Sequence, residues 1–161
     1  MLQSKPPGRR EAPVRASKIP ARGGLLQDVD YQALAQFRYR LRKFLSFSEA
    51  AAQKAGLTPQ QHQALLAIKG FSRSKPISVG GLADFLLIRH HTAVELVDRM
   101  ARLGLLRRIA DDDDGRRMLL NMTRKGEQKL LMISKLNFEE LQTATPAFTG
   151  LLRSLRRSRK R

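Results

Sequence analysis

Apolar residues recur with a helical period along the first part of the chain. Over about residues 30–55 they fall at spacings of three and four, which predicts a long amphipathic helix. The apolar positions of this stripe are Leu34, Phe37, Leu41 and Phe44. Thr58, Pro59 and Gln61 then form the pattern of a capping box that begins a second helix, and Gly70 ends that helix. The residues alone leave open whether the first stripe packs inside one chain or against a second copy.

Two further helices follow, and a short apolar break joins them. Ser78 can cap the first of them, over about residues 79–85, and the second runs from about Arg89 until Gly104 ends it. One face of the second helix is apolar, with Ala93, Val97, Met100 and Leu103. A short helix, a tight turn and an amphipathic helix are the layout of a helix-turn-helix, which we place at about residues 78–103.

A β-hairpin comes directly after the helix-turn-helix. Residues 105–110 and 117–122 are expected to form its two strands, and an acidic turn at 111–115 connects them. A hairpin in this position is the wing of a winged-helix domain, here at about residues 105–122. The expected fold class is therefore mainly α with a small β-hairpin.

Two helices are predicted after the wing. Thr123 can cap a fifth helix over about residues 124–143, and Pro146 opens a sixth over about residues 146–157. The apolar stripe of the sixth helix consists of Phe148, Leu151, Leu152 and Leu155.

The two ends of the chain are basic. Residues 1–26 are rich in proline and glycine with net charge +5, and we expect a disordered arm there; residues 158–161 form a basic tail. The whole chain has net charge +17, which points to a polyanion, nucleic acid first and an anionic membrane surface second. No apolar run is long enough to cross a bilayer and no secretory signal precedes the domain, so we expect a cytoplasmic, nucleoid-associated protein without a membrane partner.

The residue inventory argues against an enzyme. The chain has no cysteine and three histidines, two of which are adjacent in the helix that would read DNA. It has no glycine-rich phosphate loop followed by Lys-Ser/Thr and no metal-ligand spacing. We therefore expect no catalytic site, no metal and no cofactor.

Three local patterns resemble the MarR family of winged-helix transcriptional regulators. The run HTAVELVDRM at residues 91–100, followed by GLLRR at 104–108, is similar to the family's recognition helix and its entry into the wing. Asp114-Gly115-Arg116 resembles its Asp-x-Arg wing motif, and LNMTRKG at 120–126 resembles the exit from the wing into the next helix. The resemblance covers about residues 30–157, so a single domain is expected over residues 27–157.

The resemblance implies a homodimer held by the first, fifth and sixth helices. The expected interface residues are Leu34, Phe37, Leu41, Phe44, Phe148, Leu151, Leu152 and Leu155. The alternative is that these stripes form the core of one chain. Relatives often bind effectors between these helices and the DNA-binding lobe, so Phe37, Arg38 and His62 are candidates for a pocket that takes a small aromatic or phenolic effector; the alternative for each is ordinary packing or exposure.

The candidate DNA-binding residues come from the recognition helix and the wing. They are Arg89, His90, His91, Thr92, Glu95, Arg99, Arg116 and Arg117. A helix fits the major groove and arginine suits a narrow minor groove. By the resemblance, Asp114 holds the wing in shape. Glu95 has a simpler alternative, an ion pair with Arg99 one turn later. The acids at 111–113 are expected to form a solvated turn, with a divalent-metal site as the alternative.

The leading functional hypothesis is a dimeric, sequence-specific regulator that binds an inverted repeat in double-stranded DNA. We expect it to repress by covering a promoter, with affinity tuned by an effector. The alternative is a less specific nucleoid- or RNA-associated protein that uses its basic arms. A third class is a protein-interaction module whose basic surface is incidental.

Overall fold

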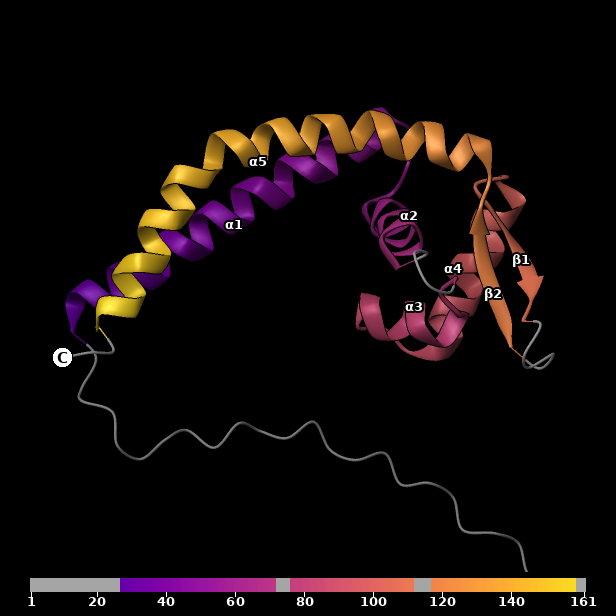
Figure 1. Cartoon of the computed structure of the whole chain (residues 1–161), viewed down its shortest axis with the longest axis horizontal. Helices are drawn as coiled ribbons and strands as arrows, with labels where there is room; N and C mark the ends of the chain where they lie inside the picture. The colour runs from indigo at the N-terminus through magenta and orange to yellow at the C-terminus, as the bar shows by residue number, and fades with distance from the viewer. Residues whose placement is uncertain (1–26, 72–75, 112–116, 159–161) are drawn as a thin grey trace, which may run out of the picture.

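The computed structural model describes residues 27–71, 76–111 and 117–158, with side chains up to residue 153. The predicted basic arm, the last three residues and the tip of the wing lie outside the described residues. Within these ranges, seven elements follow one another (Figure 1). They are α1 (Asp28–Lys54), α2 (Pro59–Phe71), α3 (Val79–Leu86), α4 (His90–Arg102), β1 (Leu106–Ala110), β2 (Met118–Met122) and α5 (Arg124–Ser158). The predicted mainly helical fold with one small β-hairpin is confirmed.

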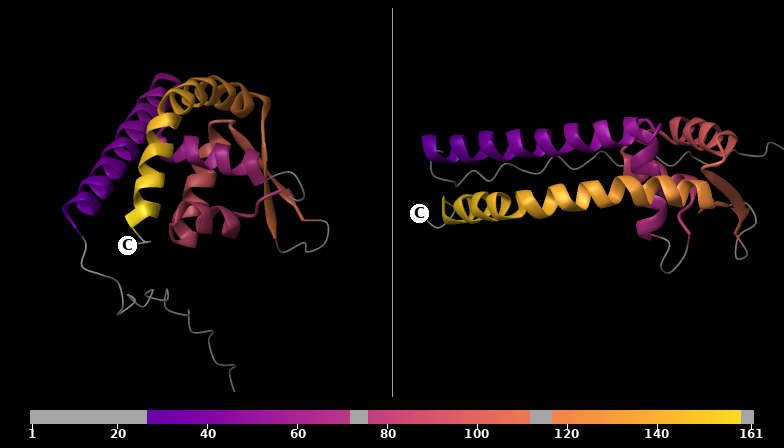
Figure 2. Two further views of the ribbon diagram at one scale, coloured as in Figure 1. Left: turned by 60° about the vertical axis from the view of Figure 1, so that its left-hand side comes forward. Right: turned by 90° about the horizontal axis from the view of Figure 1, so that it is seen from above.

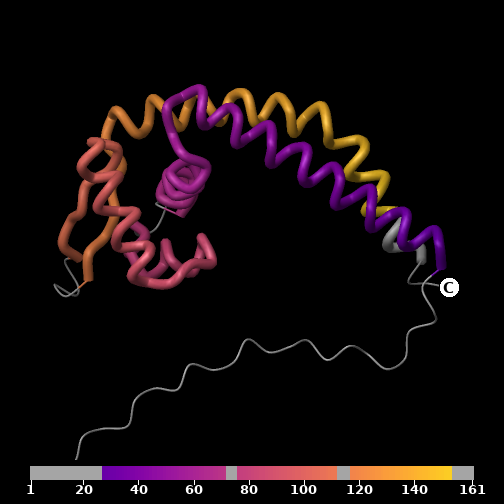
Figure 3. Tube along the Cα trace, turned by 180° about the vertical axis from the view of Figure 1, so that it is seen from behind, coloured from indigo at the N-terminus to yellow at the C-terminus, as the bar shows by residue number. Residues whose placement is uncertain are grey.

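The molecule consists of a long helical arch and a small lobe. Helices α1 and α5 lie side by side over most of their length, and the other elements form the lobe below one end of this pair (Figures 2 and 3). None of the helices in the described part of the chain has the length and apolar character needed to span a membrane.

The core lies where the lobe meets the arch. Its fully buried large side chains come from α2, α3, α4, the hairpin and α5, and include Leu65, Ile68, Leu82, Leu96, Met100, Leu105, Leu120 and Ile133. Burying one such side chain stabilises the fold by about 1.5–3 kcal/mol. Helix α1 reaches this core only through its last turns, where Ala51 and Ala52 are buried.

Side-chain caps begin α2 and α3 where the sequence predicts them. The Thr58 N–H donates to Oε1 of Gln61 at 2.9 Å, and the Gln61 N–H donates to Oγ1 of Thr58 at 3.2 Å, which completes the capping box. Oγ of Ser78 accepts from the Gly81 N–H at 3.1 Å. These bonds satisfy backbone donors that the first helical turn leaves without partners.

The hairpin is antiparallel and is attached to α3. Leu106 pairs with Met122 at one end of the ladder and Ala110 pairs with Met118 at the other. The Leu120 N–H donates to the carbonyl of Ile77 at 2.9 Å, directly before α3. The hairpin is therefore fixed to the start of the helix-turn-helix as well as to its end.

The prediction of separate fifth and sixth helices is wrong. Helix α5 is continuous and Pro146 lies inside it. Proline removes one backbone donor and crowds the preceding turn, yet the helix goes on, and the residues just before it make side-chain bonds to that turn. Oγ1 of Thr145 donates to the Leu141 carbonyl at 2.6 Å, and Oγ1 of Thr143 donates to that of Glu139 at 3.1 Å. Proline and such bonds bend helices, and the yellow end of α5 turns away from its orange part (Figure 2).

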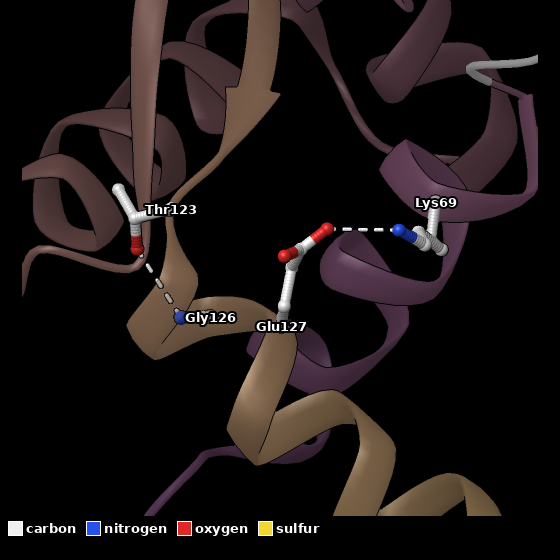
Figure 4. A network of polar contacts seen from close by, with 4 residues as sticks. All are labelled: Lys69, Thr123, Gly126 and Glu127. Atoms are coloured by element: carbon white, nitrogen blue, oxygen red, sulfur yellow. Dashed lines mark hydrogen bonds and ion pairs between the residues drawn. The ribbon is translucent and has the colours of Figure 1, made fainter.

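The first turn of α5 is packed tightly against the corner between α4 and β1. Oγ1 of Thr123 donates to the Gly104 carbonyl at 2.6 Å and accepts from the Gly126 N–H at 3.2 Å, so the predicted cap is confirmed (Figure 4). The Thr123 N–H donates to the Leu105 carbonyl at 3.1 Å. A Cβ on Gly126 would lie 2.2 Å from that same carbonyl oxygen, so no side chain fits at this position.

Two lysines of α5 complete this joint. Nζ of Lys125 donates to the Leu103 carbonyl at 2.8 Å, and Nζ of Lys129 donates to the carbonyl of Ala55. These carbonyls belong to the C-terminal ends of α4 and α1, where positive charge is favourable. An exposed ion pair between Lys69 and Glu127, 2.8 Å long, adds a contact to α2 (Figure 4).

We predict that Gly126→Ala destabilises the fold by about 3 kcal/mol, because the new methyl group must push away backbone rather than a flexible side chain. Urea denaturation measures the change. Gly70→Ala is the matched control: nothing lies within 4 Å of its added Cβ, so it should be neutral or stabilise by up to about 1 kcal/mol. Equal stability of Gly126→Ala and the wild type would contradict the close approach.

Candidate nucleic-acid interface

Helix α4 buries one face and presents the other. Ala93, Leu96, Val97 and Met100 are buried. Leu103, predicted on the apolar face, is 49% exposed. It lies after the last turn of the helix, where the chain turns away through Gly104 at φ 68°.

The N-terminal end of α4 points away from the helical arch. Its C-terminal end is held by Lys125 of α5, and its 13 residues span about 20 Å. Figure 1 shows α3 on the side of the lobe away from α5, and the start of α4 follows it in the chain. The first turn of α4 is therefore free to meet a large partner.

The predicted recognition residues lie in this first turn. Arg89 is the N-cap residue of α4, and His90 and His91 are exposed, while Thr92 is half-buried. Guanidinium, imidazole and hydroxyl groups can donate hydrogen bonds to phosphates or to base edges. The structure thus brings four predicted site residues to one exposed helix end.

Glu95 and Arg99 form the ion pair that the sequence offered as an alternative. Their side chains approach to 3.9 Å across one turn of α4, and both are about half exposed or more. Such a pair contributes a few tenths of a kcal/mol. Arg99 therefore offsets the negative charge of Glu95 on the exposed face of α4.

A second ion pair, which the sequence analysis missed, joins the hairpin to α4. Arg108 of β1 lies 2.6 Å from the carboxylate of Asp98. The pair is partly exposed, so it adds little stability, but it is a direct side-chain contact between the hairpin and the helix. No spacing rule predicts it, since it depends on how the strand crosses the helix.

The described part of the wing shows the position of one candidate DNA-binding residue, Arg117, and corrects the expectation for Asp111. Arg117 is exposed at the start of the return strand, whereas Asp114 and Arg116 lie outside the described residues. Asp111, expected in a solvated turn, is 3% exposed. Its N–H donates to the Arg117 carbonyl at 3.0 Å, so Asp111 continues the hairpin ladder instead of entering the turn. Within the described ranges, no three acidic or histidine side chains gather as metal ligands would.

A hollow of about 550 Å³ lies between α3, α4 and the hairpin. It is lined by Ser78, Val79, Gly80, His90, Val94, Arg108, Arg117 and Met118. His90 of the recognition helix and Arg117 of the wing therefore lie on one surface, together with the start of α3. The amino-acid pattern alone does not connect these three elements, because the hairpin's attachment to Ile77 is a tertiary contact.

The effector candidates are not brought together within one chain. Phe37 packs edge-on against Phe148 of α5, with ring centroids 6.1 Å apart, and Arg38 is exposed. His62 is buried in the lobe, 4% exposed. Helix α1 enters the lobe core at Ala51, which is about 20 Å along the helix from Phe37.

The residues of the two predicted apolar stripes fall into two groups. Some are buried or half-buried within the subunit, and others are exposed on its surface. Phe37 and Phe148 are half-buried and pack on each other between α1 and α5, Phe44 is also half-buried, and Leu151 is buried. Leu34, Leu41 and Leu152 are 40–56% exposed. The side chain of Leu155 lies outside the described residues.

Many more large apolar side chains of the arch are exposed. They are Val29, Tyr31, Tyr39, Leu45 and Phe47 on α1, and Leu131, Met132, Leu136, Phe138 and Leu141 on α5. Leu131, Met132 and Leu136 also line a shallow groove of about 460 Å³ on α5. An apolar surface of this extent is typical of a protein interface.

Comparisons with known proteins agree with this geometry. Residues 55–117 match the model of the MarR family. The transcriptional activatory protein BadR of Rhodopseudomonas palustris is 34% identical over 76 residues, which are 47% of this chain and 43% of BadR. The match thus spans less than half the length of that relative.

Solved structures show the same fold. A point mutant of S. aureus MepR, bound to an oligodeoxyribonucleotide, superimposes with a TM-score of 0.58 at 20% identity, over 72% of this chain and 82% of that one. RV1404 of Mycobacterium tuberculosis gives a TM-score of 0.63 at 21% identity, over 84% and 94% of the two chains.

We predict that His62 makes stability depend on pH. Burial lowers its pKa from the ordinary 6.5, and within the described structure its buried Nε2 has no hydrogen-bond partner. The unfolded chain therefore binds a proton below about pH 6.5 that the folded chain resists. The free energy of unfolding should be greatest above that pH and should decrease as the pH drops through and below it.

Urea denaturation at a series of pH values measures this effect. His62→Met should reduce the loss of stability between about pH 7 and pH 5, whereas His91→Gln, at an exposed position, should leave it as in the wild type. An unchanged pH dependence in His62→Met would show that the loss arises elsewhere.

Proposed function

We propose that this chain, whose residues 55–117 match the model of the MarR family and whose fold is that of solved MarR regulators, is a dimeric, sequence-specific regulator of transcription that acts in the cytoplasm at the nucleoid. Regulators of this family are DNA-binding proteins and not enzymes. The observation that carries the proposal is the exposed first turn of α4 on the same surface as Arg117 of the wing.

The helix end and the wing would contact two adjacent grooves. A helix fits the major groove, so Arg89, His90, His91 and Thr92 would meet base edges and phosphates there. Arg117, with Arg116 at the tip that the family pattern assigns to DNA, would enter the neighbouring minor groove or bind its phosphates. Asp114 would keep the tip in shape, and the Glu95–Arg99 pair would lie along the side of the groove. The MepR mutant bound to an oligodeoxyribonucleotide supports DNA as the partner.

We propose that a second copy covers the exposed apolar face of α1 and α5. Leu34, Leu41 and Leu152 would contact the partner directly, and Leu155 continues the same stripe in the sequence. The half-buried Phe37, Phe44 and Phe148 and the buried Leu151 would support that surface from within the subunit. A two-fold dimer presents two α4 helices, so the matching DNA site is an inverted repeat.

The regulatory outcome depends on where the site lies. A dimer that covers a promoter represses it, which is the mode we propose, although the relative BadR carries the name of an activatory protein. An effector would act by changing the separation of the two α4 helices. Phe37 and Arg38 offer an aromatic face and a cation to a phenol or an aromatic acid near the arch, whereas His62 would respond from inside the lobe.

A less specific nucleic-acid binder is the second candidate, and the net charge of +17 favours it. In that case the basic ends would supply most of the affinity and the salt dependence. A specific regulator keeps a gap of about 10³-fold or more between its own site and random DNA, which the second candidate lacks.

Selection of bound sequences from a random DNA pool tests the proposal. We expect an inverted repeat whose half-site centres lie about one helical turn, roughly 10 bp, apart. Arg117→Ala should weaken binding and lower the slope of log affinity against log salt by about 0.9 for each phosphate that the variant no longer neutralises. Lys54→Ala, an exposed charge at the end of α1, is the matched control and should change neither. Enrichment of sequences without a dyad would contradict a two-fold DNA complex.

The dimer is tested by a charge in its expected interface. Leu136 is 42% exposed, so Leu136→Lys should fold as a single chain but lose its partner, because a lysine there would be buried without an anion. Sedimentation should show a monomer of about 18.2 kDa in place of the dimer. Leu66→Lys, at a residue of the lobe that is 47% exposed, should stay dimeric. A monomeric wild type at micromolar concentration would contradict the dimer itself.

A further inference from the structure

The turn between α3 and α4 holds a large apolar side chain in a strained backbone. Leu87 ends α3 with φ 55° and ψ 42°, in the left-handed region. Its side chain is 91% exposed, more than any other large apolar residue in the described part of the chain. The other left-handed positions within residues 27–71, 76–111 and 117–158 are Gly56 and Gly104.

Neither the turn nor the core accounts for a leucine at this position. Glycine and asparagine adopt the left-handed conformation at lower cost than leucine does. An exposed side chain gains nothing from burial. The nearby exposed Phe71 and Phe85 at least pack on each other, with ring centroids 5.4 Å apart. A strained backbone conformation that no packing contact compensates is characteristic of binding sites.

The position of Leu87 fits the proposed DNA interface. It lies two residues before Arg89, the N-cap residue of α4, and three before His90. This is the end of α4 that points away from α5, as the bond between Lys125 and Leu103 requires. Duplex DNA that meets the first turn of α4 would therefore pass directly over Leu87.

We propose that Leu87 recognises thymine by packing against its C5-methyl group in the major groove. This inference rests on the DNA-binding function proposed above. The methyl group of thymine is the apolar feature that the major groove offers, and apolar side chains contact it. Arg89, His90 and His91 provide polar groups for the same groove, so Leu87 adds a contact that they do not make. The strained backbone keeps the side chain out of the lobe and available to the base.

The test replaces thymines by deoxyuridine, which lacks only this methyl group. The probe is the inverted repeat that the wild type selects, with each thymine replaced in turn. At one thymine in each half-site, the substitution should weaken wild-type binding about four-fold, the value of one buried methyl group. Leu87→Asn and Leu87→Gly should bind thymine and uracil DNA equally, and both should melt at a higher temperature than the wild type because the turn is relaxed.

A matched control separates this contact from a general loss of apolar surface. Leu66 is exposed but lies inside α2, and Leu66→Asn should keep the four-fold preference for thymine. The proposal is overturned if the wild type is insensitive to uracil at every position, or if the Leu87 variants remain as sensitive as the wild type. It is also overturned if those variants bind DNA normally but fail to regulate transcription, since Leu87 would then contact a protein. A wild type that selects no sequence at all would refute the DNA-binding function first.

Discussion

The fold depends on one close approach between two backbones. The first turn of α5 packs against the carbonyl of Leu105 so tightly that residue 126 has no room for a Cβ. Thr123 and Lys125 bond to Gly104 and Leu103 in the same corner. Because α5 also runs along α1, this corner joins the arch directly to the end of α4 and the start of the hairpin, while α2 meets the arch through Lys69 and Glu127. The corner thereby helps to set the orientation of α4 and of the hairpin relative to the arch.

Local features of the fold could be predicted from the sequence, because they depend on neighbouring residues. The caps at Thr58, Ser78 and Thr123 and the turn at Gly104 each rest on a side chain or backbone preference within four positions. Features that depend on tertiary packing could not be predicted. Pro146 has the pattern of a helix start, yet α5 continues through it along α1. Asp111 belongs to an acidic run, yet its backbone extends the hairpin and its side chain is buried.

The candidate site shows the same division. The first turn of α4 and the pair of Glu95 with Arg99 follow from helical spacing, whereas the bond between Asp98 and Arg108 and the hollow beside Gly80 require the hairpin to be in place. Apolar periodicity predicts one stripe on α1 but does not tell which of its positions contact α5. The structure leaves Phe37 half-buried against Phe148 and Leu41 exposed. His62 has no sequence signal for burial, since its nearest neighbours in the chain, Gln60, Gln61 and Gln63, are all polar.

The close packing at Gly126 also determines how a rotation of the arch is passed on to the first turn of α4. The helix is held at its C-terminal end by α5, and its exposed first turn lies about 20 Å away. If the lobe turns as a body by about 5° about this end, the first turn of α4 moves by about 2 Å over such a length, which is more than the spread of hydrogen-bond lengths. Small angular changes along the arch are therefore amplified mechanically where the helix would meet a base. The absence of a side chain at residue 126 makes this possible, because it lets α5 pack directly on the Leu105 carbonyl. A looser contact there would take up the rotation before it reached the first turn of α4.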